Sequence, residues 1–206
     1  MPWSSPKPTT RQPAETKTGW FQQLWGKEAI RTAQTTTVGP ITFQIPPEPG
    51  QAPTQADLEP TEDAPISELV RAQAAELGNN PVAILRWVHN NLEWLPSWGS
   101  LQGAESTIVM RRGNAADIAS ATISLLRAAN VPARYVVGTI EVDADRLVNW
   151  IGGAETVDAA MNLMQQGGIA TVGVTSGGRI AKVRMEHVWL QAYVNWAPSR
   201  GAKQGS

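Results

Sequence analysis

The residues of this chain that could do chemistry are a histidine in a strand-like stretch and a short polar motif at an expected helix start. The 206 residues include two histidines and no cysteine. No thiolate nucleophile is therefore available, and a zinc site built from these residue types is not expected. His187 supplies an imidazole, the group that general acid or base catalysis uses most often. Asp117, close to the helix start, is a candidate to contact His187 as an acid or base.

A buried helix over residues 114–129 must position this motif. Asn114 is a suitable N-cap because its side-chain oxygen can accept an unpaired N–H of the first turn. Asp117 faces the positive end of the helix dipole. Pro132 cannot continue the helix, and a strand is expected from Ala133. The apolar residues repeat at helical spacing and form one stripe: Ile118, Thr122, Leu125, Leu126 and Ala129.

A long strand over residues 180–196 must position His187. We expect a helical insertion at residues 143–164, a strand at residues 169–174, and then a hairpin turn of the type Ser-Gly-Gly that leads into the long strand. Alternation along the long strand assigns His187 to a face with bulky neighbours. These neighbours are Val183, Met185, Trp189, Gln191 and Tyr193, and the opposite face carries Val188, Leu190, Ala192 and Val194.

Two short helices and a loop are expected before the motif. Ser67 is a suitable N-cap for the first helix, and Pro81 stands at the natural first position of the second. His89 on the second helix is expected to be exposed. Trp94 and Trp98 lie in the following loop, where tryptophans either form the wall of a cleft or pack in the core.

The first 65 residues differ in composition from the rest of the chain. They hold most of the 15 prolines, which predicts an extension or linker with little packed structure of its own. Within it, residues 20–25 are expected to dock on the main domain through two tryptophans, a phenylalanine and a leucine, and residues 36–45 alternate like strands. We expect the folded domain at residues 66–202 and a polar tail at residues 203–206.

Charge and hydropathy exclude some classes of partner. The net charge of −1 gives no electrostatic reason to bind nucleic acid or an anionic membrane. The sequence contains no run of about 18 apolar residues, so no membrane-spanning helix is expected. The first residues do not have the pattern of a secretory signal. We expect a protein or peptide partner and no cofactor.

Residues 113–119 and 125–136, followed by residues 186–194, resemble the core signature of the transglutaminase-like superfamily. The resemblance implies an α+β, papain-like fold, in which a helix packs on an antiparallel sheet. It also implies a cysteine at a helix N-terminus, with a histidine and an aspartate on neighbouring strands. In the family pattern the cysteine would stand at Ala115, His187 would be the histidine, and the aspartate would follow on the next strand of the sheet, where this chain has already stopped. The domain is therefore expected to be incomplete at its C-terminal end.

A finer likeness is to transglutaminase-like segments of large bacterial proteins with Rhs/YD repeats. Their pattern is matched in order by Trp98-Gly99-Ser100, Gly103-Ala104, Gly113-Asn114, Asp117 and Arg200-Gly201-Ala202. On this likeness the chain would be part of a longer secreted or surface protein.

Three readings follow from this pattern. In the first, a catalytically silent domain binds peptide or packs within a larger assembly at a vestigial cleft between Ala115 and His187, with Asn114, Trp98 and Trp189 beside it. In the second, the domain is a cysteine-protease or transglutaminase-type acyl-transfer enzyme in which Ala115 replaces a cysteine. In the third, the domain is purely structural and side chains such as Trp98 or Trp189 fill the cleft.

Overall fold

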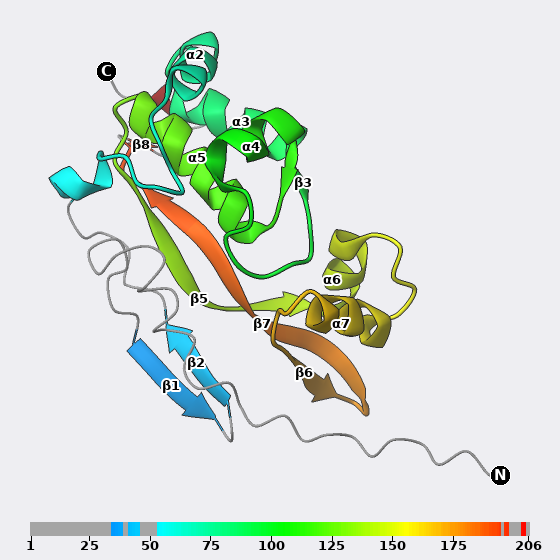
Figure 1. Cartoon of the computed structure of the whole chain (residues 1–206). Helices are drawn as coiled ribbons and strands as arrows, with labels where there is room; N and C mark the ends of the chain where they lie inside the picture. The colour runs from blue at the N-terminus through cyan, green and yellow to red at the C-terminus, as the bar shows by residue number, and fades with distance from the viewer. Residues whose placement is uncertain (1–33, 39–40, 46–52, 195, 198–202, 205–206) are drawn as a thin grey trace.

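The computed structural model describes residues 34–38, 41–45, 53–194, 196–197 and 203–204, with side chains for residues 53–194 (Figure 1). The expected docking segment at residues 20–25 lies outside the described residues. The expected strands near residues 36–45 form an antiparallel hairpin of β1 (Gln34–Val38) and β2 (Ile41–Ile45). β8 (Trp196–Ala197) pairs with β9 (Lys203–Gln204). Among the described residues, no helix is both long and apolar enough to cross a bilayer.

Helix α5 (Ala115–Ala128) is the centre of the main core. The helix expected from the sequence is confirmed, and so is its N-cap, because the Asn114 side chain accepts the N–H of Asp117 at 2.9 Å. The side chain of Asp117 accepts in turn from the Asn114 N–H, which completes a capping box. Residues 119–127 are all buried, so the helix has no solvent-facing stripe along most of its length.

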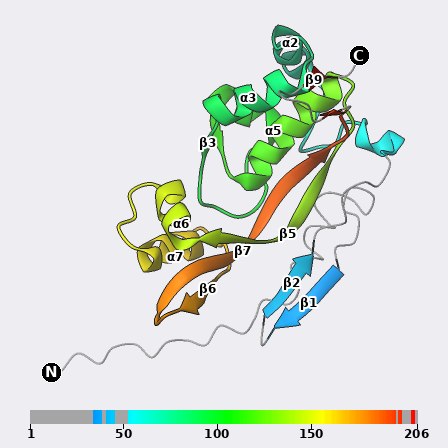
Figure 2. The same ribbon diagram turned by 180° about the vertical axis from the view of Figure 1, so that it is seen from behind.

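Three further helices surround α5 (Figures 1 and 2). They are α2 (Glu68–Glu76), α3 (Pro81–Asn91) and α4 (Gly103–Met110). The expected cap at Ser67 and the expected proline at the first position of α3 are both found. Helix α4 was not expected, because its apolar residues do not form a helical stripe: Val109 and Met110 are exposed beside the buried Ile108. β3 (Glu93–Trp94) pairs in parallel with β4 (Arg112–Gly113) and holds the loop after α3 against the start of α5.

The main sheet is antiparallel with strand order β5-β7-β6. β5 (Ala133–Asp143) pairs along nearly the whole of β7 (Arg179–Ala192), and β6 (Thr171–Ser176) joins β7 through the expected glycine hairpin. The long strand ends at Ala192 instead of the expected residue 196. The sheet and its packing on α5 give the α+β class that the sequence predicts, with a helix against an antiparallel sheet.

The sheet is covered on opposite faces at its two ends. Near one end Val137 and Val188, a cross-strand pair, pack in the cluster around α5. Near the other end the pair Ile140 and Met185 packs in a second cluster with α6 (Ala144–Ile151) and α7 (Val157–Gln166), the expected helical insertion. Because side chains alternate along a strand, these two pairs lie on opposite faces. The covered face therefore changes between residues 185 and 188 of β7, where His187 lies opposite Gly138.

Residues 53–65, called the strap below, pack against α5, although the sequence had suggested a linker up to residue 65. Ala64 is fully buried in the main core, and the Ser124 hydroxyl donates to the Pro65 carbonyl at 2.7 Å. The guanidinium of Arg127 donates to the carbonyls of Asp57 and Glu59. Composition did not reveal this packing because the carbonyls that hold the strap belong to the backbone and leave no mark on residue type.

The buried Arg127 joins the strap to the sheet, since its guanidinium also donates twice to the Ala133 carbonyl, at 3.1 and 2.9 Å. Burial lowers the pKa of Arg127, and the opposing effects of Tyr135, Asp57 and Glu59 are smaller. No described carboxylate is within ion-pair distance of Arg127. Backbone carbonyl oxygens therefore stabilise its positive charge.

We expect Arg127→Ala to lower the free energy of unfolding by about 2–4 kcal/mol, because the carbonyls of Asp57, Glu59 and Ala133 lose charge-assisted hydrogen bonds, two of them in buried surroundings. Denaturant unfolding measures this loss. Arg86→Ala, on the exposed side of α3, is the matched control and should change stability by less than about 0.5 kcal/mol. Equal effects of the two substitutions would contradict the assignment.

Candidate functional site

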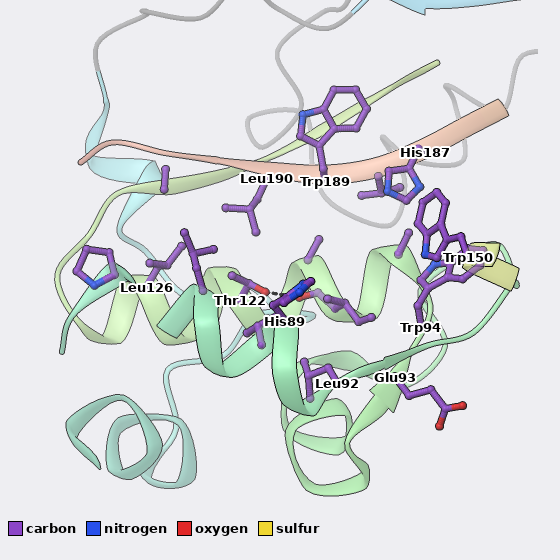
Figure 3. A pocket seen from close by; sticks show the side chains of 18 of the residues that line it. His89, Leu92, Glu93, Trp94, Thr122, Leu126, Trp150, His187, Trp189 and Leu190 are labelled. Atoms are coloured by element: carbon purple, nitrogen blue, oxygen red, sulfur yellow. Dashed lines mark hydrogen bonds between the residues drawn. The ribbon is translucent and has the colours of Figure 1, made fainter. Parts of the chain in front are cut away.

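A groove of about 950 Å³ lies between α3, α5 and β7 (Figure 3). Its lining is mostly apolar, with Thr122, His89, Glu93 and His187 as polar members. The apolar lining comes from α3 and the residues after it (Pro81, Leu85, Val88, Leu92, Trp94), from α5 (Ala115, Ile118, Ala119, Leu126), from α6 (Trp150, Ile151) and from β7 and the residues after it (Val188, Trp189, Leu190, Ala192, Val194).

Ala115 and His187 both line this groove. Ala115 is the first residue of α5, so the positive end of the helix dipole and the free N–H groups of the first turn lie beside its methyl group. His187 comes from the middle of β7. The structure thus brings to one cavity the two residues that the family pattern pairs. A methyl group has no lone pair, so the position at the helix end cannot act as a nucleophile.

Aromatic rings surround His187. The Trp150 ring meets the imidazole edge-on with centroids 5.5 Å apart, and the Trp189 ring stacks at 6.3 Å. Trp150 stacks in turn on Trp94 at 4.6 Å (Figure 3). Desolvation by these neighbours lowers the pKa of His187 from 6.5 to about 4, so the imidazole is neutral at pH 7.

Two polar groups at the groove have no hydrogen-bond partner within the described part of the chain. The imidazole of His187 makes only ring contacts there, and no described carboxylate orients it. The indole Nε1 of Trp94 is buried and unpaired among the same residues. A neutral imidazole can make a hydrogen bond with an uncharged ligand, such as an amide group.

Asn114 and Asp117 do not line the groove, which corrects two of the sequence expectations. Both are 1% exposed. One carboxylate oxygen of Asp117 accepts from the N–H groups of Leu101 and Gln102, at 3.0 and 3.1 Å, and the other accepts from Asn114. Its proposed contact with His187 is therefore not formed. The Asn114 amide donates to the Gly99 carbonyl. The two side chains fix the loop at residues 99–102 to the start of α5.

Of the two roles expected for Trp98, the structure shows core packing. It is not part of the groove lining and packs against both apolar clusters instead. Its backbone N–H donates to the Gly167 carbonyl at 2.9 Å, so it joins the loop to the end of α7. The groove remains open among the described residues, and neither Trp98 nor Trp189 fills it.

Sequence reasoning missed the contribution of α6 to the site. Trp150 was expected only as part of a helical insertion, yet it contacts both Trp94 and His187. No sequence signal indicated this role, because Leu147, Trp150 and Ile151 stand at the helical spacing of an ordinary apolar stripe. His89 is exposed, as expected, and lies at the rim of the groove.

No group of three or more potential metal ligands occurs among the described residues. The polar members of the groove are too few and too scattered to form a coordination shell of protein ligands alone.

The lowered pKa of His187 has a consequence for stability. Between about pH 6.5 and 4 an unfolded chain binds a proton on this histidine while the folded chain does not. The contribution of the neutral imidazole is therefore complete above pH 6.5 and is lost as pH falls toward 4. We expect the free energy of unfolding to decrease in this window by up to about 1.4 kcal/mol per pH unit from this residue.

Unfolding of the wild-type chain and of His187→Phe at pH 7, 6 and 5 would measure this term as a difference, because the titration of carboxylates is common to both proteins. The same pH dependence in His187→Phe and the wild type would show that the imidazole is not held neutral.

The model of the transglutaminase-like superfamily core matches residues 66–201. No curated protein matches the chain. Among solved structures, the chain is similar to the 1.9 Å crystal structure of a candidate cysteine protease from Cytophaga hutchinsonii, with 23% identity and a TM-score of 0.40. The match covers 67% of this chain and spans 37% of that protein. The chain belongs to the transglutaminase-like superfamily.

Proposed function

We propose that this domain is a catalytically silent transglutaminase-like module that binds an apolar peptide segment in the groove between α3, α5 and β7. One observation carries the proposal: at the helix end that would hold a nucleophile, a methyl group faces an open apolar groove beside an imidazole that is neutral and unpaired in the described chain. The elements that would position a reaction remain, while the reacting atom is absent.

The hydroxyl groups near Ala115 do not replace the missing thiol. Thr122 is the one hydroxyl residue in the groove lining, and its Oγ1 donates to the Ile118 carbonyl at 2.7 Å. Ser120 lies away from the groove, donates to the Ala116 carbonyl and accepts from the Tyr135 hydroxyl. A serine or threonine needs an adjacent base to become a nucleophile. His187 is not hydrogen-bonded to either residue.

The lining of the groove favours a peptide over a charged ligand. Ligand sites in proteins are typically apolar with a few polar groups that fix orientation. Here Trp94, Trp150 and Trp189 supply broad apolar contact, and the imidazole of His187 is a possible hydrogen-bonding group. Glu93 is the one charged residue in the lining, and it is exposed. A backbone amide with uncharged neighbours satisfies these groups without burying a charge.

We also propose that the domain is part of a larger protein. The likeness of the sequence to transglutaminase-like segments of large bacterial Rhs/YD-repeat proteins supports a module within a longer secreted or surface protein. In that setting the groove would hold a segment of the same assembly.

A second candidate function is acyl transfer in a form of the protein that carries a cysteine at position 115. The shared cavity of Ala115 and His187 favours this candidate. Against it stands the low pKa of His187, because a thiolate is stabilised by an imidazolium and this ring resists protonation.

Ala115→Cys tests this second candidate. We expect amide hydrolysis and amine transfer to stay far below about 1 s⁻¹, the low end for ordinary enzymes, because no described carboxylate orients His187. Release of a fluorogenic amine and incorporation of a labelled amine would be measured. Ala119→Cys is the matched control, since it places a thiol in the same groove one turn further along α5. Robust turnover by Ala115→Cys alone would refute the silent-domain proposal.

Two exposed leucines give a matched test of peptide binding. Leu85 is 46% exposed on α3 and lines the groove, whereas Leu69 is 39% exposed on α2 and does not. The probe is Ac-Lys-Val-Thr-Leu-Thr-Val-Thr-Lys-NH2, whose affinity for the full chain is measured by calorimetry. Leu85→Glu should weaken binding by about tenfold or more, because it places a carboxylate in the apolar lining. Leu69→Glu should leave the affinity within about twofold. If the wild-type chain does not bind the probe, the proposed groove function is wrong.

A further inference from the structure

Two contacts dock the α6–α7 insertion on one short segment of the chain, residues 94–98. The Trp150 ring, near the end of α6, stacks on the Trp94 ring with centroids 4.6 Å apart. At the end of α7, the Gly167 carbonyl accepts the backbone N–H of Trp98 at 2.9 Å. Each helix of the insertion is therefore held at its C-terminal end by the same stretch of backbone.

Residues 94–98 are themselves fixed to the start of α5. Trp94 pairs with Gly113 where β3 and β4 run in parallel. The Leu95 N–H donates to the Gly113 carbonyl at 2.9 Å. Gly113 lies two residues before Ala115, the first residue of α5. A shift of the insertion relative to this segment is therefore also a shift relative to Ala115 and the groove.

Gly167 is a point of close backbone approach between the insertion and this segment. A Cβ on Gly167 would overlap the Pro96 carbonyl oxygen, and it would lie 2.8 Å from the Pro96 carbonyl carbon and 3.1 Å from the Ser97 Cα. All three atoms belong to the backbone, so no change of side-chain rotamer could make room. The backbone of Gly167 has φ −72° and ψ 0°, in the right-handed region that is open to other residues. Glycine is therefore needed here for space and not for conformation.

The two helices of the insertion pack together, so a movement of α7 is passed to α6. Both contribute fully buried side chains to the second cluster: Leu147, Ala160 and Met164. Closely packed side chains transmit a displacement because few voids are present to absorb it. One turn further along α6, Trp150 lies between the Trp94 ring and the imidazole of His187 (Figure 3). A displaced α7 would therefore move Trp150 relative to His187.

The neutral state of His187 depends on its apolar surroundings. Burial is the cause of its lowered pKa, with no contribution from a charged neighbour. Glu186, the preceding residue, is directed to the other face of β7. The other titratable residues of the groove lining and of α6 are exposed: His89, Glu93, Asp145 and Arg146. Loss of the Trp150 ring would therefore expose the imidazole to water and raise its pKa.

We propose that Gly167 is a positioning residue, which lets the end of α7 dock on residues 96–98 and thereby keeps Trp150 against the imidazole of His187. The α6–α7 insertion then covers the histidine at a position fixed by this contact. The role of Gly167 does not depend on a bound peptide, so the inference goes beyond the proposed function and is tested without a ligand.

Gly167→Ala in the full chain tests this role. The added methyl group should displace the end of α7 and uncover His187, so that the pKa of His187 rises from about 4 toward 6.5 by about one unit or more. The pKa is measured from the NMR chemical shifts of the imidazole as the pH is changed. Gln166→Ala is the matched control, because Gln166 is the exposed residue before Gly167 and its truncation removes atoms. The control should keep the pKa of His187 within about 0.3 units of the wild type.

Trp150→Ala tests the second step. This substitution should raise the pKa of His187 by itself, because it removes the ring that meets the imidazole edge-on. In the Trp150→Ala background, Gly167→Ala should then add no further rise. Such non-additivity identifies two residues that act on the histidine through one another. Additive rises would show that Gly167 does not act through Trp150, which would overturn the inference.

A measurement on the wild-type chain keeps the inference testable if Gly167→Ala does not fold. In urea below the unfolding transition, local opening of the contact should speed hydrogen exchange of the Trp98 amide. Modification of His187 by diethyl pyrocarbonate, followed by peptide mass spectrometry, should speed up by the same factor. His89 is exposed and serves as the internal control, since its modification needs no opening.

Two further results would overturn the inference. An unchanged pKa of His187 in a folded Gly167→Ala chain would show that the contact of α7 with residues 96–98 does not control the site. Modification of His187 that does not follow exchange of the Trp98 amide would show that the imidazole is uncovered by a different movement.

Discussion

A buried carboxylate at the start of α5 fixes the part of the structure on which the site depends. Asp117 accepts three backbone N–H groups, two from the loop before α4 and one from the N-cap of its own helix. A buried charge is tolerated only when it is fully hydrogen-bonded, so the loop and the helix start must keep their relative position. Gly113 leaves little room there, since a Cβ at this position would lie 2.8 Å from the Asp117 Cβ. As a result Asn114 and Asp117 hold Ala115 at the groove, although neither of them lines the groove.

The change of covered face along the sheet produces the environment of His187. Along β7, the α5 cluster covers one face of the sheet from Val188 to Ala192. The α6–α7 cluster covers the other face at Val183 and Met185. His187 lies between the two clusters and opposite Gly138, which offers no side chain to pair with it. The rings of Trp150 on α6 and Trp189 on β7 pack beside the imidazole and reduce its contact with water. The low pKa of the histidine is therefore a result of the topology of the sheet and not of a charged neighbour.

These constraints separate the scaffold of the superfamily from its chemistry. The helix start, the strand with the histidine and the cavity between them are all present, and their stability does not depend on a reactive side chain at position 115. Removal of a nucleophile leaves such a scaffold intact, because the energy of the fold comes from burial and backbone hydrogen bonds. What remains is an apolar groove between α3, α5 and β7. Of the readings that the sequence allowed, a cleft filled by Trp98 or Trp189 is the one that the described residues disfavour.

The sequence by itself determined the elements whose causes are local. Asn114 and Asp117 predicted the start of α5, Ser67 predicted the start of α2, and alternation along β7 assigned Val188 and His187 to opposite faces, because caps and strand periodicity depend on residues a few positions apart. Tertiary structure alone decided three features. Trp150 reached His187, Arg127 bound the strap, and Asp117 turned to the loop before α4 instead of the groove. These contacts join residues 16 to 70 positions apart. Their partners include ring faces and backbone groups, whose use is not encoded in residue type, so only the packed chain could select them.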